Sequence, residues 1–79
     1  MVEKAIIREH LSQAERHVAL GAQHIREQKE RIVEFERSGH DTAAARDLLR
    51  IFEEMQVLHI ADRDRLQQEL VDNTDPRGE

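Results

Sequence analysis

Histidine is the residue type through which this chain could most readily do chemistry, because 79 residues include five histidines. A neutral imidazole binds transition metals, and its charge changes near neutral pH. His10, His17 and His24 repeat every seven residues, which on a helix places them about 10 Å apart, too far to share one ion. No two histidines stand three or four residues apart, the spacing that chelates a metal on one helix. The remaining possibility joins His17 to His59 and Asp62 from a second segment.

A structural role explains the same histidines without any ligand. The repeated histidines lie beside an apolar row, where an apolar ring with a polar tip suits a half-buried position. His59 falls within the apolar row of the second segment and could fill a notch there. We favour this structural interpretation. A metal or haem-type ligand at His17, His59 and Asp62, with His24 as a further candidate, and a pH-sensitive contact stay open as alternatives.

His59, Asp62 and Asp64 are the residues that acid–base chemistry could use. Residues three apart on a helix are neighbours, so His59 and Asp62 could meet. A catalytic site also needs a pocket and groups that grip a substrate, and two helices alone provide no concavity. The chain has no glycine-rich phosphate loop, nucleophile elbow or EF-hand spacing. We therefore predict no enzyme activity, no catalytic residue and no cofactor.

The composition is typical of a long-helix or coiled-coil protein. Charged residues make up 37% of the chain, with one proline and no cysteine, tryptophan or tyrosine. The formal net charge is −5, and arginine and glutamate alternate along the chain without a basic face, so we expect no nucleic-acid partner. The apolar runs are too short to span a membrane, and the first residues lack the apolar core of a signal peptide. A cytoplasmic location is the resulting expectation.

Two periodic segments flank one cluster of turn residues, Ser38 to Thr42. Gly39 suits the left-handed position just past a helix end, and Asp41 or Thr42 can cap the next helix. The sequence predicts helices over about 3–38 and 42–71, a turn at 39–41 and a flexible tail at 72–79.

The apolar period in the first segment is close to seven, which predicts a coiled-coil seam. Its two rows are Leu11, Val18, Ile25, Ile32 and Ile7, Ala14, Gly21, Gln28, Phe35. The row Glu9, Arg16, Gln23, Glu30, Arg37 is polar and is expected to face water. The predicted seam of the second segment is Ala45, Leu48, Phe52, Met55, His59, Asp62, Leu66.

A short turn favours antiparallel neighbours, so the fold class is an all-α antiparallel two-helix hairpin. Pairing residues whose numbers sum to about 79 places Gly21 opposite His59 and Ile32 opposite Leu48.

The chain resembles a family of short, uncharacterised helical proteins from bacteria, especially alphaproteobacteria. The resembling stretches include Arg8–Leu11, Ala14–Ala19, Ser38–Thr42, Phe52–Glu54 and Arg63–Leu66, and they cover most of residues 8–70. The resemblance implies the hairpin and its boundaries and carries no assigned activity.

Apolar residues left outside the seam predict a partner surface, because two lone helices have no second layer to cover them. The predicted interface residues are Ile51, Leu58, Leu49, Ile60 and Leu20, with Ile51 and Leu58 at the centre. We expect a homodimer of two hairpins forming a four-helix bundle. The function this favours is a non-catalytic interaction or self-assembly module. A small regulator presenting a helical face to a larger, unidentified protein is the alternative.

Overall fold

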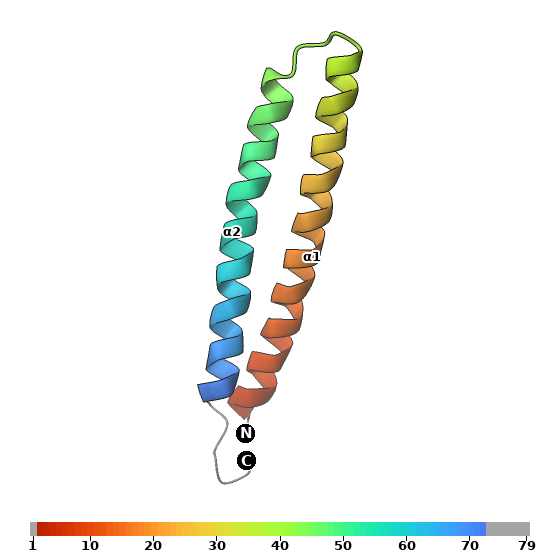
Figure 1. The fold of residues 1–79 in the computed structure, drawn as a ribbon. Coiled ribbons are helices and arrows are strands. Elements are labelled where there is room, and N and C mark those ends of the chain that lie inside the picture. Colours follow the sequence, from red (N-terminus) through yellow and green to blue (C-terminus); the bar gives the residue numbers. More distant parts are fainter. Residues whose placement is uncertain (1, 73–79) are drawn as a thin grey trace.

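Two long helices joined by the loop 38–42 form a hairpin in the computed structural model, which describes residues 2–72 (Figure 1). Helix α1 spans Val2–Arg37 and helix α2 spans Ala43–Asp72. These bounds differ by one residue at each end from the predicted 3–38 and 42–71. The helices lie side by side in a rod of 63 × 17 × 14 Å. The predicted tail was 72–79, but Asp72 is the last residue of α2, and residues 73–79 lie outside the described residues.

The end of α1 depends on a glycine in the left-handed region. Gly39 has φ +74°, as predicted for this position. Its N–H donates to the carbonyl of Glu36 at 3.2 Å, and the N–H of His40 donates to the carbonyl of Phe35 at 2.9 Å. This pair of bonds is the Schellman arrangement, which satisfies carbonyls that the helix end would leave free.

The start of α2 is capped from the loop. The Asp41 carboxylate accepts a hydrogen bond from the Ala43 N–H at 2.9 Å, and the Thr42 carbonyl accepts the first helical bond, from the Arg46 N–H at 2.8 Å. Arg46 also forms an ion pair with Glu36 of α1. Both halves of the loop are therefore held by local polar contacts.

The predicted seam of α1 is confirmed. Residues of its two rows are buried or half-buried, whereas the polar row Glu9, Arg16, Gln23, Glu30, Arg37 is exposed. The α1 residues turned toward α2 are Ile7, Leu11, Ala14, Val18, Gly21, Ile25, Gln28, Ile32 and Phe35.

The seam of α2 is only partly as predicted. Ala45, Phe52, His59 and Leu66 are buried or half-buried, seven residues apart. The prediction that Leu48, Met55 and Asp62 lie between them is wrong, because these three side chains are exposed. The intervening positions are taken by their sequence neighbours, Leu49, Gln56 and Arg63.

Two glutamines within the seam connect the helices, and one of them, Gln56, replaces Met55 on the inward side of α2. Gln28 of α1 donates through Nε2 to the carbonyl of Ala45 at 2.8 Å. Gln56 of α2 donates through Nε2 to the carbonyl of Val18, also at 2.8 Å. Each bond joins a side chain to the backbone of the other helix, so sliding or rotating either helix would leave a largely buried amide without its partner.

The predicted opposition of Gly21 and His59 is also wrong. Gly21 lies against Gln56, so that a Cβ placed on Gly21 would come within 2.8 Å of Gln56 Cδ. His59 lies against His17, with ring centroids 5.3 Å apart. The numbers of this pair sum to 76 rather than about 79.

Within residues 2–72, neither helix contains a stretch apolar enough and long enough for a bilayer crossing.

Candidate functional site

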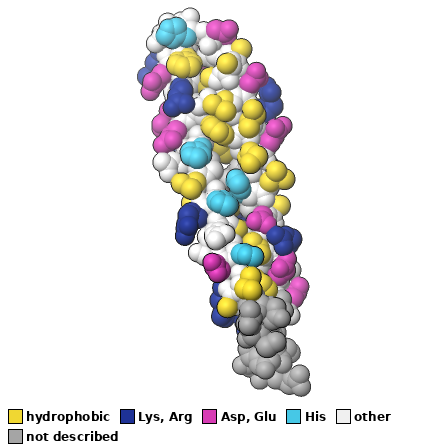
Figure 2. Space-filling view, turned by 180° about the vertical axis from the view of Figure 1, so that it is seen from behind, with side chains coloured by type: hydrophobic (Ala, Val, Ile, Leu, Met, Phe, Trp, Pro, Cys, Tyr) yellow, Lys and Arg dark blue, Asp and Glu magenta, His cyan; other side chains and the backbone are white. Residues whose placement is uncertain are grey.

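A row of exposed apolar side chains on α2 is the most prominent surface feature. Leu48, Ile51, Met55 and Leu58 expose 38%, 52%, 46% and 63% of their surface. Their spacing of three, four and three residues places them along one side of the helix, and we call them the α2 stripe. Figure 2 shows hydrophobic side chains gathered along one face of the hairpin, with histidines beside them. This alternation of three and four residues is the spacing found in coiled-coil seams.

The same side of α2 becomes charged beyond Leu58. Asp62, Arg65 and Glu69 continue the spacing, and Arg65 pairs with both carboxylates at 2.5 Å. The hydrogen bond to Asp62, followed by that to Glu69, raises the pKa of the Arg65 guanidinium above its ordinary value. The apolar surface therefore has a defined end, with fixed charges beyond it.

The predicted interface residues do not all share this face. Ile51 and Leu58 belong to the α2 stripe, whereas Leu49 is half-buried on the side that faces α1. Ile60 is exposed, but two residues of helix rotate it by about 200° from Leu58, to a different side. Leu20 is exposed on α1. The sequence prediction missed Leu48 and Met55, because both had been placed in the hairpin seam.

Three of the histidines contact rings across the hairpin. His17 faces His59, and His24 lies 5.7 Å from Phe52 between ring centroids. The predicted third ligand, Asp62, pairs with Arg65 instead. Among residues 4–72, no group of three or more histidine, aspartate or glutamate side chains is arranged to hold a metal.

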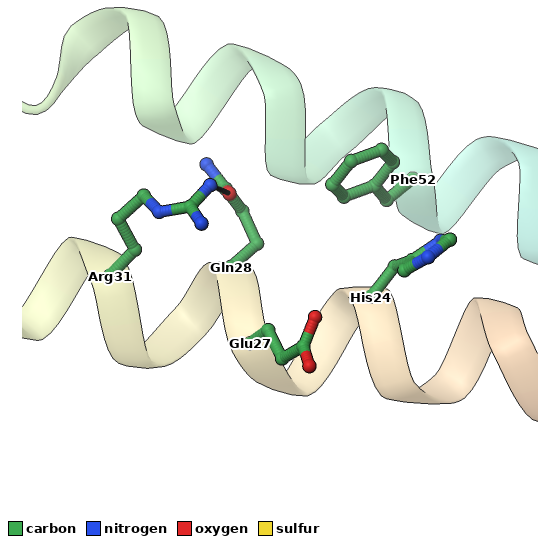
Figure 3. Close-up of a pocket in the computed structure, with 5 residues that line it drawn as sticks. All are labelled: His24, Glu27, Gln28, Arg31 and Phe52. Atoms are coloured by element: carbon green, nitrogen blue, oxygen red, sulfur yellow. Dashed lines mark hydrogen bonds between the residues drawn. The ribbon is translucent and has the colours of Figure 1, made fainter.

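A small pocket of about 140 Å³ opens beside the His24–Phe52 pair (Figure 3). Gln28 and Arg31 extend from α1 toward α2, and Arg31 donates to Gln28 Oε1 at 3.1 Å. Glu27 completes the lining and accepts a hydrogen bond from Gln23 at 3.0 Å. The amide and guanidinium are thus already engaged with protein groups, which leaves the pocket as a hollow in the surface rather than a set of converging donors.

The chain matches no family model, no curated protein and no solved structure. The resemblance to short bacterial helical proteins therefore stays a prediction. A proposal about function rests on the surface of the hairpin described above.

The α2 stripe offers an apolar contact surface rather than a cluster of reactive side chains. The α2 stripe is open, straight and bordered by polar side chains, which is the pattern of a helix-packing surface. The local signal for it was present in the sequence as the 3-4-3 spacing of Leu48, Ile51, Met55 and Leu58.

Proposed function

We propose that the protein is a non-catalytic self-assembly module, in which two antiparallel hairpins pack through their α2 stripes into a coiled-coil-like four-helix bundle. The observation that carries the proposal is the α2 stripe. Burying one large aliphatic side chain is worth roughly 1.5–3 kcal/mol. Four such side chains in a row therefore represent a large share of the stability of a domain this small.

The surface area of the chain supports a second copy as the occupant. The chain exposes 6020 Å², whereas a compact monomer of its 9.3 kDa mass exposes about 5000 Å². The excess of about 1000 Å², which follows from the elongated shape of a two-helix rod, leaves room for the roughly 800 Å² that each partner contributes to a standard interface. A second hairpin offers the same stripe in return, so a two-fold contact closes on itself.

Charge favours an arrangement in which the two α2 helices run in opposite directions. A two-fold axis between Ile51 and Met55 brings Leu48 against Leu58 of the second copy. Asp62 then lies beside the first turn of the other α2, which has no acidic residue of its own and whose dipole favours carboxylates. Asp41, in the loop before this turn, caps one of its N–H groups. A parallel arrangement would instead place Asp62 against its own copy, which is destabilising.

Light scattering after size exclusion of the full chain at micromolar concentration tests the proposal. The expected mass is 18.6 kDa, twice the 9.3 kDa of one chain. Leu58→Lys should give the monomer mass, because it places a charge in the apolar contact. Val57→Lys is the matched control, since Val57 is 66% exposed but lies about 100° around the helix from Leu58, and this variant should remain dimeric.

A helical wild-type monomer with a cooperative melt would contradict self-assembly and assign the stripe to another protein. If Leu58→Lys and Val57→Lys have the same mass in solution, the interface does not lie on the α2 stripe.

The direction of packing has its own readout, because the chain has no cysteine. A spin label on Ser38→Cys reports the separation of the two loops. With opposed α2 helices the loops lie about 40 Å apart. With parallel helices they lie within about 20 Å, a few helix diameters at most.

A further inference from the structure

We propose that His17 and His59 form a two-histidine site for a borderline divalent transition metal such as Zn²⁺. The inference goes beyond self-assembly and does not rest on it, because both ligands belong to one chain. His17 is exposed on α1, and His59 is half-buried on α2. The two imidazoles therefore come from different helices and meet only when the hairpin is folded.

The spacing of the rings matches coordination of a single ion. The ring centroids are 5.3 Å apart and the ring planes are tilted by 46°. A zinc–nitrogen bond of about 2.0–2.1 Å in tetrahedral geometry places the centroids of two coordinated imidazoles about 5 Å apart. This separation is compatible with one ion held between the two rings, whereas His10 lies one heptad away from His17 and is exposed.

The donor set defines both the class of metal and the type of site. Neutral imidazole suits zinc, copper and nickel, whereas magnesium and calcium prefer oxygen ligands. Asp62 is held by Arg65 at 2.5 Å, so the protein supplies two donors and water completes the coordination shell. Such a site is open and exchangeable, in contrast to a closed structural site with four protein ligands.

Thermal unfolding of the untagged, metal-stripped full chain at pH 7.5 and fixed protein concentration provides the test. A metal that binds only the folded hairpin raises the melting temperature. Zn²⁺ at ten times its dissociation constant corresponds to about 1.4 kcal/mol, a rise of about 6–11 °C for a chain of this length. Mg²⁺ should produce no rise, because it prefers oxygen ligands.

Matched histidine variants decide whether this pair is the site. His17→Gln and His59→Gln should each abolish the rise, and His10→Gln should retain it. Imidazole proton resonances provide a second readout that does not depend on how well the variants fold. In the wild type, Zn²⁺ should shift the His17 and His59 signals together and leave His10 in place. The proposal is overturned if the wild type shows no rise, if either pair variant keeps it, or if His10→Gln removes it.

Discussion

Gly21→Ala tests the register of the hairpin, because Gly21 lies directly against Gln56. In an open helical position this change stabilises a protein by about 1 kcal/mol, since alanine loses less backbone freedom on folding. Here the added Cβ would come within 2.8 Å of Gln56 Cδ. The Gln56 amide would have to move and give up its 2.8 Å bond to the Val18 carbonyl.

When Gln56 is present, the gain from the reduced backbone freedom of alanine and the cost of displacing the Gln56 amide nearly cancel. A lost hydrogen bond costs about 0.5–1.5 kcal/mol, with a further cost if the displaced amide stays buried without a partner. We therefore expect Gly21→Ala to be neutral or destabilising by up to about 1 kcal/mol. When Gln56→Ala has already removed the obstacle, the same change should stabilise by about 1 kcal/mol. The coupling between the two sites should then be about 1 kcal/mol or more.

Urea denaturation of the two single variants, the double variant and the wild type measures this coupling at matched protein concentration. A second cycle with Gln28→Ala is the control, because Gln28 lies two helical turns from Gly21 and should combine with it additively, within about 0.5 kcal/mol. If Gly21→Ala stabilises equally with and without Gln56, the two residues are not in contact and the register described above is incorrect.

Two further substitutions test the loop and the seam. Gly39→Val should lower the free energy of unfolding by on the order of 1 kcal/mol or more, because φ is +74° at this position and a β-branched residue is strained there; unchanged thermal melting would show that the loop does not depend on a left-handed residue. Gln28→Ala should cost about 1–3 kcal/mol, because the 2% exposed side chain loses its bonds to Ala45 and Arg31. The exposed Gln23→Ala should stay within about 0.5 kcal/mol, and equal denaturation midpoints for these two variants would contradict the role of Gln28.

The loop and the α1 seam could be predicted from the sequence because local rules determine both. Gly39 is the one glycine between the two periodic segments, and few other residues adopt the backbone that ends a helix this way. The sevenfold rows of α1 contain apolar residues at nearly every position. Burying them leaves a single choice for the face that turns toward the other helix.

The α2 seam could not be predicted in the same way, because two faces compete. From Ala45, the next inward residue can be three or four positions on. Leu48 and Met55 are together more apolar than Leu49 and Gln56, so hydrophobicity alone favours the wrong pair. The deciding interaction joins Gln56 to the backbone of Val18 beside Gly21, and its energy depends on a partner that periodicity does not encode.

The His17–His59 contact was missed as the principal pairing for a related reason. Its register depends on how α2 is rotated against α1, and this rotation differs from the predicted one at Leu48, Met55 and Asp62. The sequence identified both residues as candidate ligands but placed His59 against Gly21. The two rings come close only in this register, and the sequence pattern alone does not determine the register.

The polar seam and the exposed stripe of α2 are two consequences of one rotation. Turning Gln56 inward lets its amide donate to Val18, and the same turn carries Met55 outward, to 46% exposure. An isolated hairpin would gain more from the opposite rotation, which buries a thioether side chain and leaves an amide in water. The observed rotation gives up that burial within one chain and places four apolar residues in an outward row. This exchange is favourable when a second helical layer covers the row, which is the physical basis of the self-assembly that we propose.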